Sequence, residues 1–284
     1  MPQLEGVKME LQDSAFPLLR EVIIGSDPRK VFEGINWALL IGAKPRSAGM
    51  ERKDLLHDNG RIFQEQGRAL SDVASPDIRV LVVGNPCNTN CLIALHNAKN
   101  IPPMRFFAMT RLDENRAKAY LAEKAHYPVE AVTRMAIWGN HSSTQVPDAF
   151  HALIDGRPAT EVIDDRAWLE GELIHKVQTR GAEILKARGK SSAGSAASAI
   201  CDAVRALTCP TKEGDWFSSA IYSADTSYNI DRDLVFSLPC RFSAYGVAKE
   251  VAGIDWNPFL EAKIRATEKE LIEERNLSKE LLKG

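Results

Sequence analysis

The sequence predicts an α/β fold, in which buried strands alternate with helices. Short, nearly unbroken apolar runs mark the expected strands: Val22–Ile24, Trp37–Ile41, Val80–Val83 and Met135–Trp138. Each is followed at once by a glycine, and such runs without polar alternation are typical of strands buried on both faces, as in parallel sheets. Helix-like stretches lie between them: Asp54–Val73, Cys91–Lys99 and Asn115–Ala125. This alternation favours a parallel α/β sheet in the first half of the chain.

The second half is expected to be more helical. Trp168–Ala187 and Ser191–Leu207 carry apolar residues close to helical spacing, and Pro258–Leu282 has the pattern of a charged amphipathic helix. Between them, Trp216–Ser243 is richer in residues that favour strands and turns, so it could form an antiparallel ribbon.

Composition and charge exclude several classes of function. The chain has 284 residues, and its 36 Lys and Arg residues nearly balance 38 Asp and Glu residues, so no basic field invites nucleic acid or an anionic membrane. No apolar run approaches the roughly 18 residues of a membrane span, and the N-terminus lacks a signal-peptide pattern. The five cysteines include no CxxC pair, and Cys87 and Cys91 are expected to be packing residues rather than metal ligands. We therefore expect a soluble protein of the cytoplasm.

Polar residues follow three of the expected strands, at Gly42–Arg46, Gly84–Pro86 and Gly139–His141. In open α/β sheets, ligands bind beyond the carboxyl ends of the strands. Each of these residues could singly belong to an ordinary loop, but together they place a histidine, an arginine and asparagine side chains at one rim.

Two further segments carry chemistry, each with an alternative. Asp113 and Arg116 share a helix face, where the Asp can orient a histidine and the Arg can pair with a carboxylate; a capping Asp with a surface Arg is the alternative. The stretch Gly42–Asp54 carries Arg46 and Arg52 between two glycines, as a mobile lid over an anionic substrate would, or as a solvated turn before a helix.

Four strings extend these motifs in one fixed order: Gly-Met-Glu-Arg-Lys-Asp-Leu-Leu at 49–56, Val-Val-Gly-Asn-Pro-Cys-Asn-Thr-Asn-Cys at 82–91, Thr-Arg-Leu-Asp-Glu-Asn-Arg-Ala-Lys-Ala at 110–119, and Ile-Trp-Gly-Asn-His-Ser-Ser-Thr-Gln at 137–145. In order and separation they resemble the malate dehydrogenases, specifically the cytosolic-type branch of the lactate/malate dehydrogenase superfamily. The likeness runs from Leu4 to the C-terminus.

The resemblance implies a role for each site residue. His141 would exchange a proton with the malate hydroxyl during hydride transfer, and Asp113 would orient His141 and stabilise its cation. Arg116 would pair with the carboxylate beside the reacting carbon, and Arg46 and Arg52 would bind the distal carboxylate. The chemistry agrees, because this reaction needs a proton acceptor of near-neutral pKa and a dicarboxylate needs two cationic sites.

The resemblance also implies NAD as the cofactor, with no metal, since hydride transfer belongs to the cofactor. NAD is chosen over NADP as the commoner preference in the family. The residues that match cofactor-contacting positions are Asn59, Gln66, Val83, Gly84, Asn85 and Ser195. Asn85 would also touch the substrate.

The likeness starts after the strand, Gly-rich turn and helix that open this family, so roughly 45 residues, about one βαβ unit, are expected to be missing. We therefore expect an N-terminally truncated Rossmann-type NAD-binding domain over residues 1–108, followed by an α+β substrate-binding catalytic domain over residues 109–284. The missing turn would cradle the cofactor pyrophosphate.

The expected function is reversible oxidation of malate to oxaloacetate, as in the tricarboxylic acid cycle, by a chain that forms a homodimer when full length. One alternative is an impaired, truncated homologue that acts only as a subunit or remnant. Another is a dehydrogenase for a different 2-oxo acid, which Arg46 disfavours because the related lactate dehydrogenases need no cation there.

Overall fold

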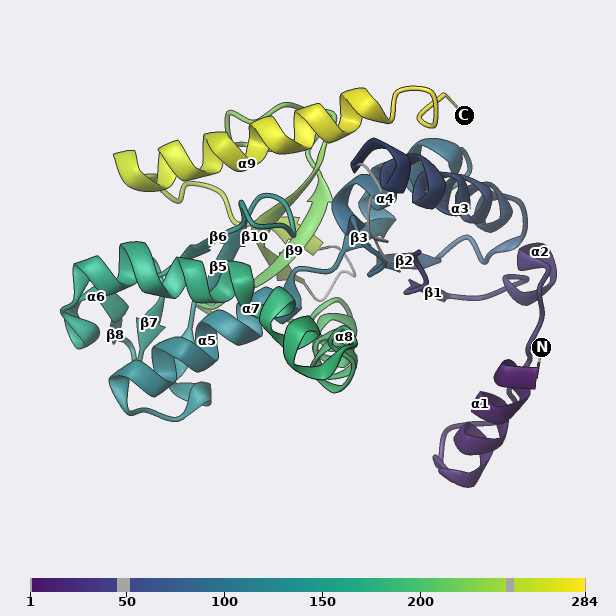
Figure 1. The fold of residues 1–284 in the computed structure, drawn as a ribbon, viewed down its shortest axis with the longest axis horizontal. Helices are drawn as coiled ribbons and strands as arrows, with labels where there is room; N and C mark the ends of the chain where they lie inside the picture. The colour runs from purple at the N-terminus through teal and green to yellow at the C-terminus, as the bar shows by residue number, and fades with distance from the viewer. Residues whose placement is uncertain (1, 45–51, 244–247, 284) are drawn as a thin grey trace.

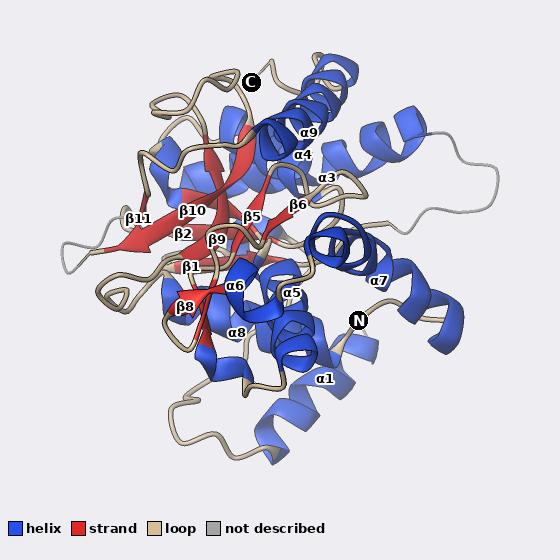
Figure 2. Ribbon diagram, turned by 90° about the vertical axis from the view of Figure 1, so that its left-hand side faces the viewer, coloured by secondary structure: helices blue, strands red, loops and turns tan. Residues whose placement is uncertain are grey.

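The computed structural model describes residues 2–44, 52–243 and 248–283. Its main sheet has six strands in the order β1-β2-β3-β9-β10-β11 (Figures 1 and 2). The strands are β1 (Trp37–Leu40), β2 (Arg79–Val82), β3 (Phe106–Ala108), β9 (Phe217–Tyr222), β10 (Val235–Phe242) and β11 (Ala248–Glu250). The first three are parallel and the others join antiparallel. This confirms the predicted α/β class and the ribbon predicted within Trp216–Ser243.

Every helix expected from the sequence is present. These helices are α3 (Arg52–Val73), α4 (Cys87–Asn97), α5 (Arg111–Ala125), α7 (Leu173–Arg188), α8 (Gly194–Ala206) and α9 (Pro258–Leu277). A π-helical turn, η3 (Trp168–Glu172), leads into α7. The helices that were not expected are short or lie near the N-terminus: α1 (Pro2–Asp13), α2 (Pro28–Val31), η1 (Pro103–Arg105), η2 (Val129–Ala131) and α6 (Ala159–Ile163).

The strand expected at Met135–Trp138 does not join the parallel sheet, so that part of the prediction is wrong. It forms β5 (Ala136–Trp138), which pairs antiparallel with β6 (Val146–Asp148). A separate small sheet contains β4 (Val132–Thr133), β7 (Leu153–Ile154) and β8 (Arg157–Pro158). The end of β5 is nevertheless tied to the main sheet, because Gly139 bridges Ser237 of β10. This bridge brings the segment after β5 toward the ends of the parallel strands.

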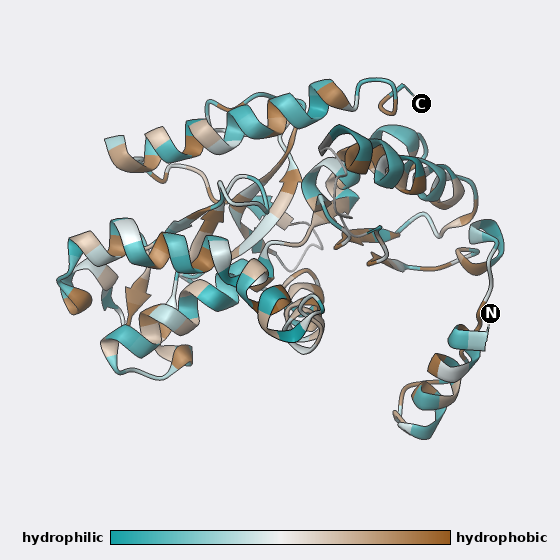
Figure 3. Cartoon of the chain, viewed as in Figure 1, coloured by the Kyte–Doolittle hydropathy of each residue, from teal (hydrophilic) through white to brown (hydrophobic). Residues whose placement is uncertain are grey.

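The expected strand at Val22–Ile24 is also wrong, because this run has no regular secondary structure and links α1 to α2. Its hydrophobic residues have no strand to pair with among residues 2–44, 52–243 and 248–283, and Ile23 is 70% exposed. Helix α1 buries none of its side chains and projects from the rest of the chain (Figure 1). Figure 3 shows hydrophobic residues along this projecting part. Exposed large hydrophobic side chains are thus more frequent in the first part of the chain than in the remainder of the fold.

Packing is dense around β5. The side chain of Trp138 is fully buried and meets Tyr228 and Trp256 edge-on, at 5.1 and 5.4 Å between ring centroids. Its indole Nε1 donates a hydrogen bond of 3.0 Å to Asp148 on β6. Helices α3 and α4 close a second core over β1, β2 and β3. The end of β5, where His141 follows, is therefore held by a well-packed frame.

Candidate active site

The segment that carries His141 begins with a tight turn at Gly139. Its backbone has a φ of +92°, and a Cβ atom there would overlap the side chain of Thr267 on α9. The N–H of Gly139 donates to the Ser237 carbonyl at 3.1 Å, and the Ser237 N–H donates back at 3.0 Å. Only glycine fits this conformation and this approach. The turn therefore fixes the direction in which the chain delivers His141.

His141 is held from α4 and α5 at the same time. Its backbone N–H donates to the Asn88 side chain at 3.0 Å, and its Nδ1 hydrogen-bonds the Asp113 carboxylate. Asn88 is completely buried and also donates to the carbonyls of Gly139 and Val235, at 3.2 and 2.9 Å. The structure thus brings the predicted pair His141 and Asp113 together, although 28 residues separate them.

The charge of Asp113 controls the imidazole. Burial by itself lowers the pKa of His141, but the negative charge and the hydrogen bond of Asp113 outweigh burial, so the pKa lies above its ordinary value. Arg116 acts in the opposite direction. Asp113 is fully buried, whereas the His141 side chain is 17% exposed. Nδ1 faces the carboxylate, so Nε2, which has no hydrogen-bond partner among the described residues, is the nitrogen left to exchange a proton.

Arg116 lies beside this pair. Its Nη1 is 3.2 Å from the Asp113 carboxylate, and its Nη2 makes a weak contact of 3.4 Å with the Ser192 hydroxyl. The two ends of the guanidinium fork thus have different partners, one strong and one weak. The weak one is the side on which an external carboxylate could compete.

Two predicted residues meet near the carboxyl end of β2: Asn85, which follows the strand, and Asn59, which reaches it from α3. Asn85 is exposed, whereas Asn59 is buried and uses its amide on the chain itself. Asn59 accepts from the Lys44 N–H at 2.7 Å and donates to the carbonyls of Lys44 and Asn85, at 3.1 and 3.3 Å. In this structure Asn59 therefore joins the segments after β1 and β2 beneath the rim, and its expected contact with a cofactor stays a prediction.

The backbone predicted to contact a cofactor has a structural role as well. The N–H groups of Val83 and Gly84 both donate to the Leu40 carbonyl, at 2.9 and 3.0 Å. A Cβ atom on Gly84 would crowd Phe63, Ala43 and the Gly42 carbonyl, at 2.9 to 3.1 Å. These contacts hold the ends of β1 and β2 side by side.

The remaining predicted residues divide into three cases. Gln66 on α3 has a buried Oε1 without a hydrogen-bond partner among the described residues. Ser195 is exposed in the first turn of α8. Arg52 begins α3, but its side chain lies outside the description, as does the whole of Arg46. The predicted lid therefore stays a prediction.

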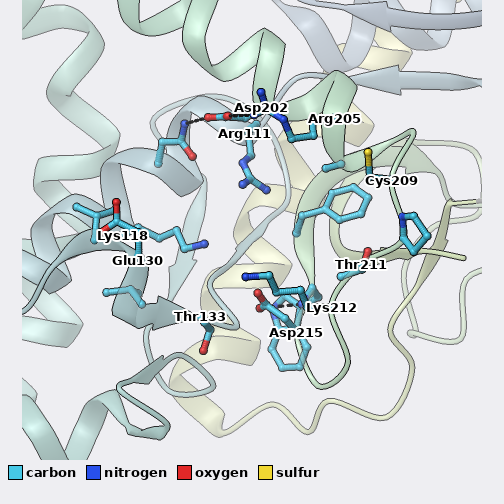
Figure 4. Close-up of a pocket in the computed structure, with 17 residues that line it drawn as sticks. Arg111, Lys118, Glu130, Thr133, Asp202, Arg205, Cys209, Thr211, Lys212 and Asp215 are labelled. Carbon is cyan, nitrogen blue, oxygen red and sulfur yellow. Dashed lines mark hydrogen bonds and ion pairs between the residues drawn. The ribbon is translucent and has the colours of Figure 1, made fainter.

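A cavity of about 650 Å³ lies elsewhere, between α5, α8 and the segment before β9 (Figure 4). In Figure 4 the side chains of Arg111, Lys118 and Lys212 point into it. The charged residues of its lining nearly balance, with Arg111, Lys118, Arg205 and Lys212 against Glu130, Asp202 and Asp215. No residue of the predicted site lines this cavity, so it is separate from the chemistry around His141.

Sequence reasoning missed the residues that anchor the His141 segment, namely Asn88 on α4 and the polar face of α9. An asparagine inside an apolar helix and charges on an amphipathic helix carry no pattern that sets them apart.

Cys87 and Cys91 are buried, which agrees with their expected packing role. The described residues contain no cluster of His, Cys, Asp or Glu suited to a metal ion, and none of their helices is long and apolar enough to cross a membrane.

Residues 1–108 match the lactate/malate dehydrogenase NAD-binding domain, and residues 110–282 match the lactate/malate dehydrogenase alpha/beta C-terminal domain. A chloroplastic NADP malate dehydrogenase of Flaveria bidentis is 56% identical over 272 residues, which is 96% of this chain. The chain spans only 60% of the length of that relative.

Two further relatives align over nearly the whole chain. The malate dehydrogenase of Protochlamydia amoebophila is 53% identical over 280 residues, covering 99% of this chain and 85% of the relative. The crystal structure of a malate dehydrogenase from Naegleria fowleri superposes with a TM-score of 0.94 at 45% identity, over 99% of this chain and 85% of that one.

Proposed function

We propose, from the premise that this chain belongs to the lactate/malate dehydrogenase family, that it catalyses the reversible oxidation of malate to oxaloacetate with a nicotinamide cofactor. The observation that carries the proposal is the buried contact between Asp113 and the imidazole of His141, which raises the pKa of that imidazole. A histidine of this kind is suited to exchanging a proton with a substrate hydroxyl near neutral pH.

In the proposed mechanism, His141 takes the hydroxyl proton of malate on Nε2 while Nδ1 stays bound to Asp113. Asp113 fixes the tautomer and stabilises the imidazolium that forms, because the carboxylate is close and shielded from water. In the reverse direction, the imidazolium returns its proton to the oxygen of oxaloacetate. The raised pKa keeps His141 protonated to a higher pH, which favours this reductive direction.

Arginines would recognise the two carboxylates. Arg116 offers its Nη2 side to the carboxylate beside the reacting carbon, because the contact with Ser192 is weak enough to exchange. Arg46 and Arg52 would bind the distal carboxylate and favour oxaloacetate over a monocarboxylate such as pyruvate.

The backbone of Val83 and Gly84 at the end of β2, together with Asn85 and with Gln66 of α3, would contact the nicotinamide cofactor. Asn85 presents an exposed amide at the rim, and the buried Oε1 of Gln66 lacks a partner within the described ranges. Asn59 fixes the backbone that carries Asn85, and Ser195 would approach from α8. The bound cofactor would supply hydride transfer. The division into a nucleotide-binding part, residues 1–108, and a substrate-binding part, residues 109–284, belongs to the same proposal.

The choice of cofactor and location is a finer part of the proposal. We keep NAD and the cytoplasm, supported by the cytosolic-type motifs around His141 and by the NAD-binding domain match. The Flaveria relative carries an NADP and chloroplast designation, so both nicotinamide cofactors belong in the assay. Comparing kcat/KM for NADH and NADPH on the same preparation decides the point.

Assembly as a homodimer is supported by the exposed apolar residues of the first part of the chain. Leu18 is 86% exposed and Ile23 is 70% exposed, and burial against a second copy would remove such surface from water. Light scattering coupled to size exclusion measures the mass directly. A monomer of 31.4 kDa at working concentration would contradict the dimer.

The decisive experiment replaces His141 with Asn. We expect oxaloacetate-dependent oxidation of NADH to fall by about 10²–10⁴-fold, which is the usual contribution of general acid–base catalysis. His126→Asn is the matched control, because His126 is exposed and ends α5 in a left-handed conformation that Asn tolerates. Normal turnover in His141→Asn, or an equal loss in His126→Asn, would overturn the assignment.

A further inference from the structure

The C-terminal helix α9 holds the segment that carries His141 from the side opposite Asp113. The contact centres on a single oxygen, Oε2 of Glu270, which accepts three hydrogen bonds. The donors are the side chains of Asn140 at 3.0 Å, Ser142 at 2.5 Å and Thr144 at 2.6 Å. These are alternate residues, and the first two flank His141 directly.

Two neighbours of Glu270 on the same helix face, Thr267 and Glu274, add further hydrogen bonds to this segment. Thr267 accepts the backbone N–H of Asn140 at 2.9 Å and lies 2.9 Å from the Thr144 hydroxyl. Glu274 accepts from Asn140 Nδ2 at 3.2 Å and binds the hydroxyl of Thr89 on α4. Spacings of three and four residues put these side chains on one stripe of the helix. Helix α9 therefore contacts the backbone and the side chains on both sides of His141.

The chemistry of Glu270 suits this task. An ionised carboxylate only accepts hydrogen bonds, and one of its oxygens can take several donors at once. Hydrogen bonds to a charged acceptor are about twice as strong as neutral ones. Three donors bound to one oxygen restrict how far residues 140, 142 and 144 can move apart. His141 lies between residues 140 and 142, so its backbone is restricted as well.

Neither of the other anchors fixes the segment along its length. Asp113 holds the imidazole at Nδ1, and Asn88 holds the backbone N–H of the same residue. Ser142 and Thr144 are held by α9, because their hydroxyls meet Glu270, and the next contact along the segment is from Gln178 on α7 to the Gln145 carbonyl at 2.8 Å. Misplacing a reacting group by about 1 Å can cost about 10²-fold in rate.

From these contacts we propose that Glu270 is a positioning residue: through Asn140, Ser142 and Thr144 it sets where the Nε2 of His141 lies relative to the substrate. The catalytic part of this inference rests on the proposed function, whereas the geometric part does not. The pKa of His141 is governed by burial, Asp113 and Arg116, so the loss of Glu270 should leave that pKa unchanged. The loss should lower kcat, because Nε2 of His141 is then misplaced relative to the substrate.

The test measures the rate at which diethyl pyrocarbonate modifies His141, by peptide mass spectrometry, across pH. The full chain is compared with Glu270→Ala, Glu270→Gln and Glu273→Ala. Glu273 is the matched control, because it is a glutamate on the exposed face of the same helix. We expect at least fivefold faster modification in Glu270→Ala, an unchanged midpoint of the pH dependence, and parental behaviour in Glu273→Ala. Glu270→Gln keeps an oxygen for the donors and should stay within about threefold of the parent.

Turnover is measured on the same preparations. Glu270→Ala should lower kcat at least tenfold with little change in KM for the nicotinamide cofactor, and Glu270→Gln should recover most of the rate. Ser142→Ala, which leaves Glu270 intact, should give a smaller rise in modification and a smaller loss of kcat, and it keeps the test decisive if Glu270→Ala does not fold.

Parental modification rates in Glu270→Ala, or in Ser142→Ala where Glu270→Ala does not fold, would overturn the inference, as would a shifted pH midpoint. A parent chain that modifies as expected but does not reduce oxaloacetate would overturn the proposed function alone, because the modification rates do not depend on turnover.

Discussion

The segment around His141 and the first 26 residues are held in opposite ways. Hydrogen bonds described for residues 2–26 join partners no more than four residues apart, and the large apolar side chains there face outward. The His141 segment is fixed by partners that lie 28 to 134 residues away, on α4, α5 and α9. One region has only local structure, and the other has almost only long-range structure.

Because of this difference, we expect the His141 segment to be sensitive to substitution and the first 26 residues to tolerate it. Where each backbone and side-chain group has a distant partner, one substitution disturbs several elements, and the loss appears in both stability and chemistry. Where contacts are local and side chains are exposed, substitution changes little in the isolated chain. Four variants put this contrast to the test.

The largest effect is expected from Asp113→Asn. Removing the charge and forcing a different tautomer on His141 should lower turnover by on the order of 10²–10⁴-fold, as loss of an orienting carboxylate does elsewhere. The pKa of His141 should fall, so the remaining reductive activity should move to lower pH. A pH–rate profile measures both, with Asp225→Asn as the exposed control.

The same variant has a signature in stability. Asp113 raises the folded-state pKa of His141, so its contribution is complete below the unfolded pKa, which is about 6.5. It is lost as pH rises through the folded-state pKa. The gap in melting temperature between parent and Asp113→Asn should therefore be wider at pH 6 than at pH 9, and a gap that widens with pH would contradict the pairing.

Gly139→Ala should destabilise the protein by about 3 kcal/mol or more, because backbone strain and overpacking each cost about 1–3 kcal/mol. The strain comes from the φ of +92°, and the overlap is with Thr267. Gly156→Ala isolates the strain, since its φ is +76° and a Cβ atom there meets no described atom within 4 Å. Urea unfolding compares the two, and equal losses would show that Thr267 does not crowd the turn.

Asn88→Ala should cost about 2 kcal/mol, because it leaves the partly buried N–H of His141 and the buried carbonyls of Gly139 and Val235 without their partner. Asn100→Ala removes an exposed side chain that donates to the Ser71 carbonyl and should cost about 0.5 kcal/mol. Chemical denaturation ranks the two. Indistinguishable values would mean that Asn88 does not hold the His141 segment.

The smallest effect is expected from Leu18→Ala in dilute, monomeric protein, within about 0.5 kcal/mol, because Leu18 is 86% exposed in the single chain. Leu173→Ala, in the core, should cost about 2–5 kcal/mol. Unfolding of Leu18→Ala should be followed at several protein concentrations. A loss that grows as the protein is concentrated would support the proposed homodimer through this region, whereas a large loss in the dilute monomer would contradict the difference between the two regions.

Patterns local to the chain predicted much of the fold. Helical periodicity found α3, α8 and α9, and unbroken apolar runs found β1 and β2, since both signals arise from which side chains must leave water. The three-residue strand β3 (Phe106–Ala108) was too short to carry such a signal. The apolar run at Val22–Ile24 looked like a strand, but a strand also needs a neighbour, and no local pattern reveals one.

The site likewise contains residues that a local sequence pattern predicts and residues that only the tertiary structure reveals. His141 stood out because it follows an apolar run, whereas its pairing with Asp113 was expected only through resemblance, since no periodicity links positions 28 residues apart. Glu270 was indistinguishable from the solvated charges of an amphipathic helix until α9 was placed against residues 140–144. Antiparallel pairing of β5 with β6 likewise depends on the turn between them, which hydrophobicity does not encode.

The aromatic cluster beside His141 has an optical consequence. Trp138 meets Tyr228 and Trp256 nearly at right angles, while Tyr228 and Trp256 stack with an interplanar angle of 9°. Rings fixed this way in an asymmetric environment give near-ultraviolet circular dichroism that vanishes when tertiary packing is lost. The first tryptophan in the chain is Trp37, so no indole belongs to the projecting N-terminal part. Four of the five tryptophans lie within residues 109–284, so the near-ultraviolet tryptophan signal should mainly report the tertiary packing of that part and should not change when the N-terminal end frays.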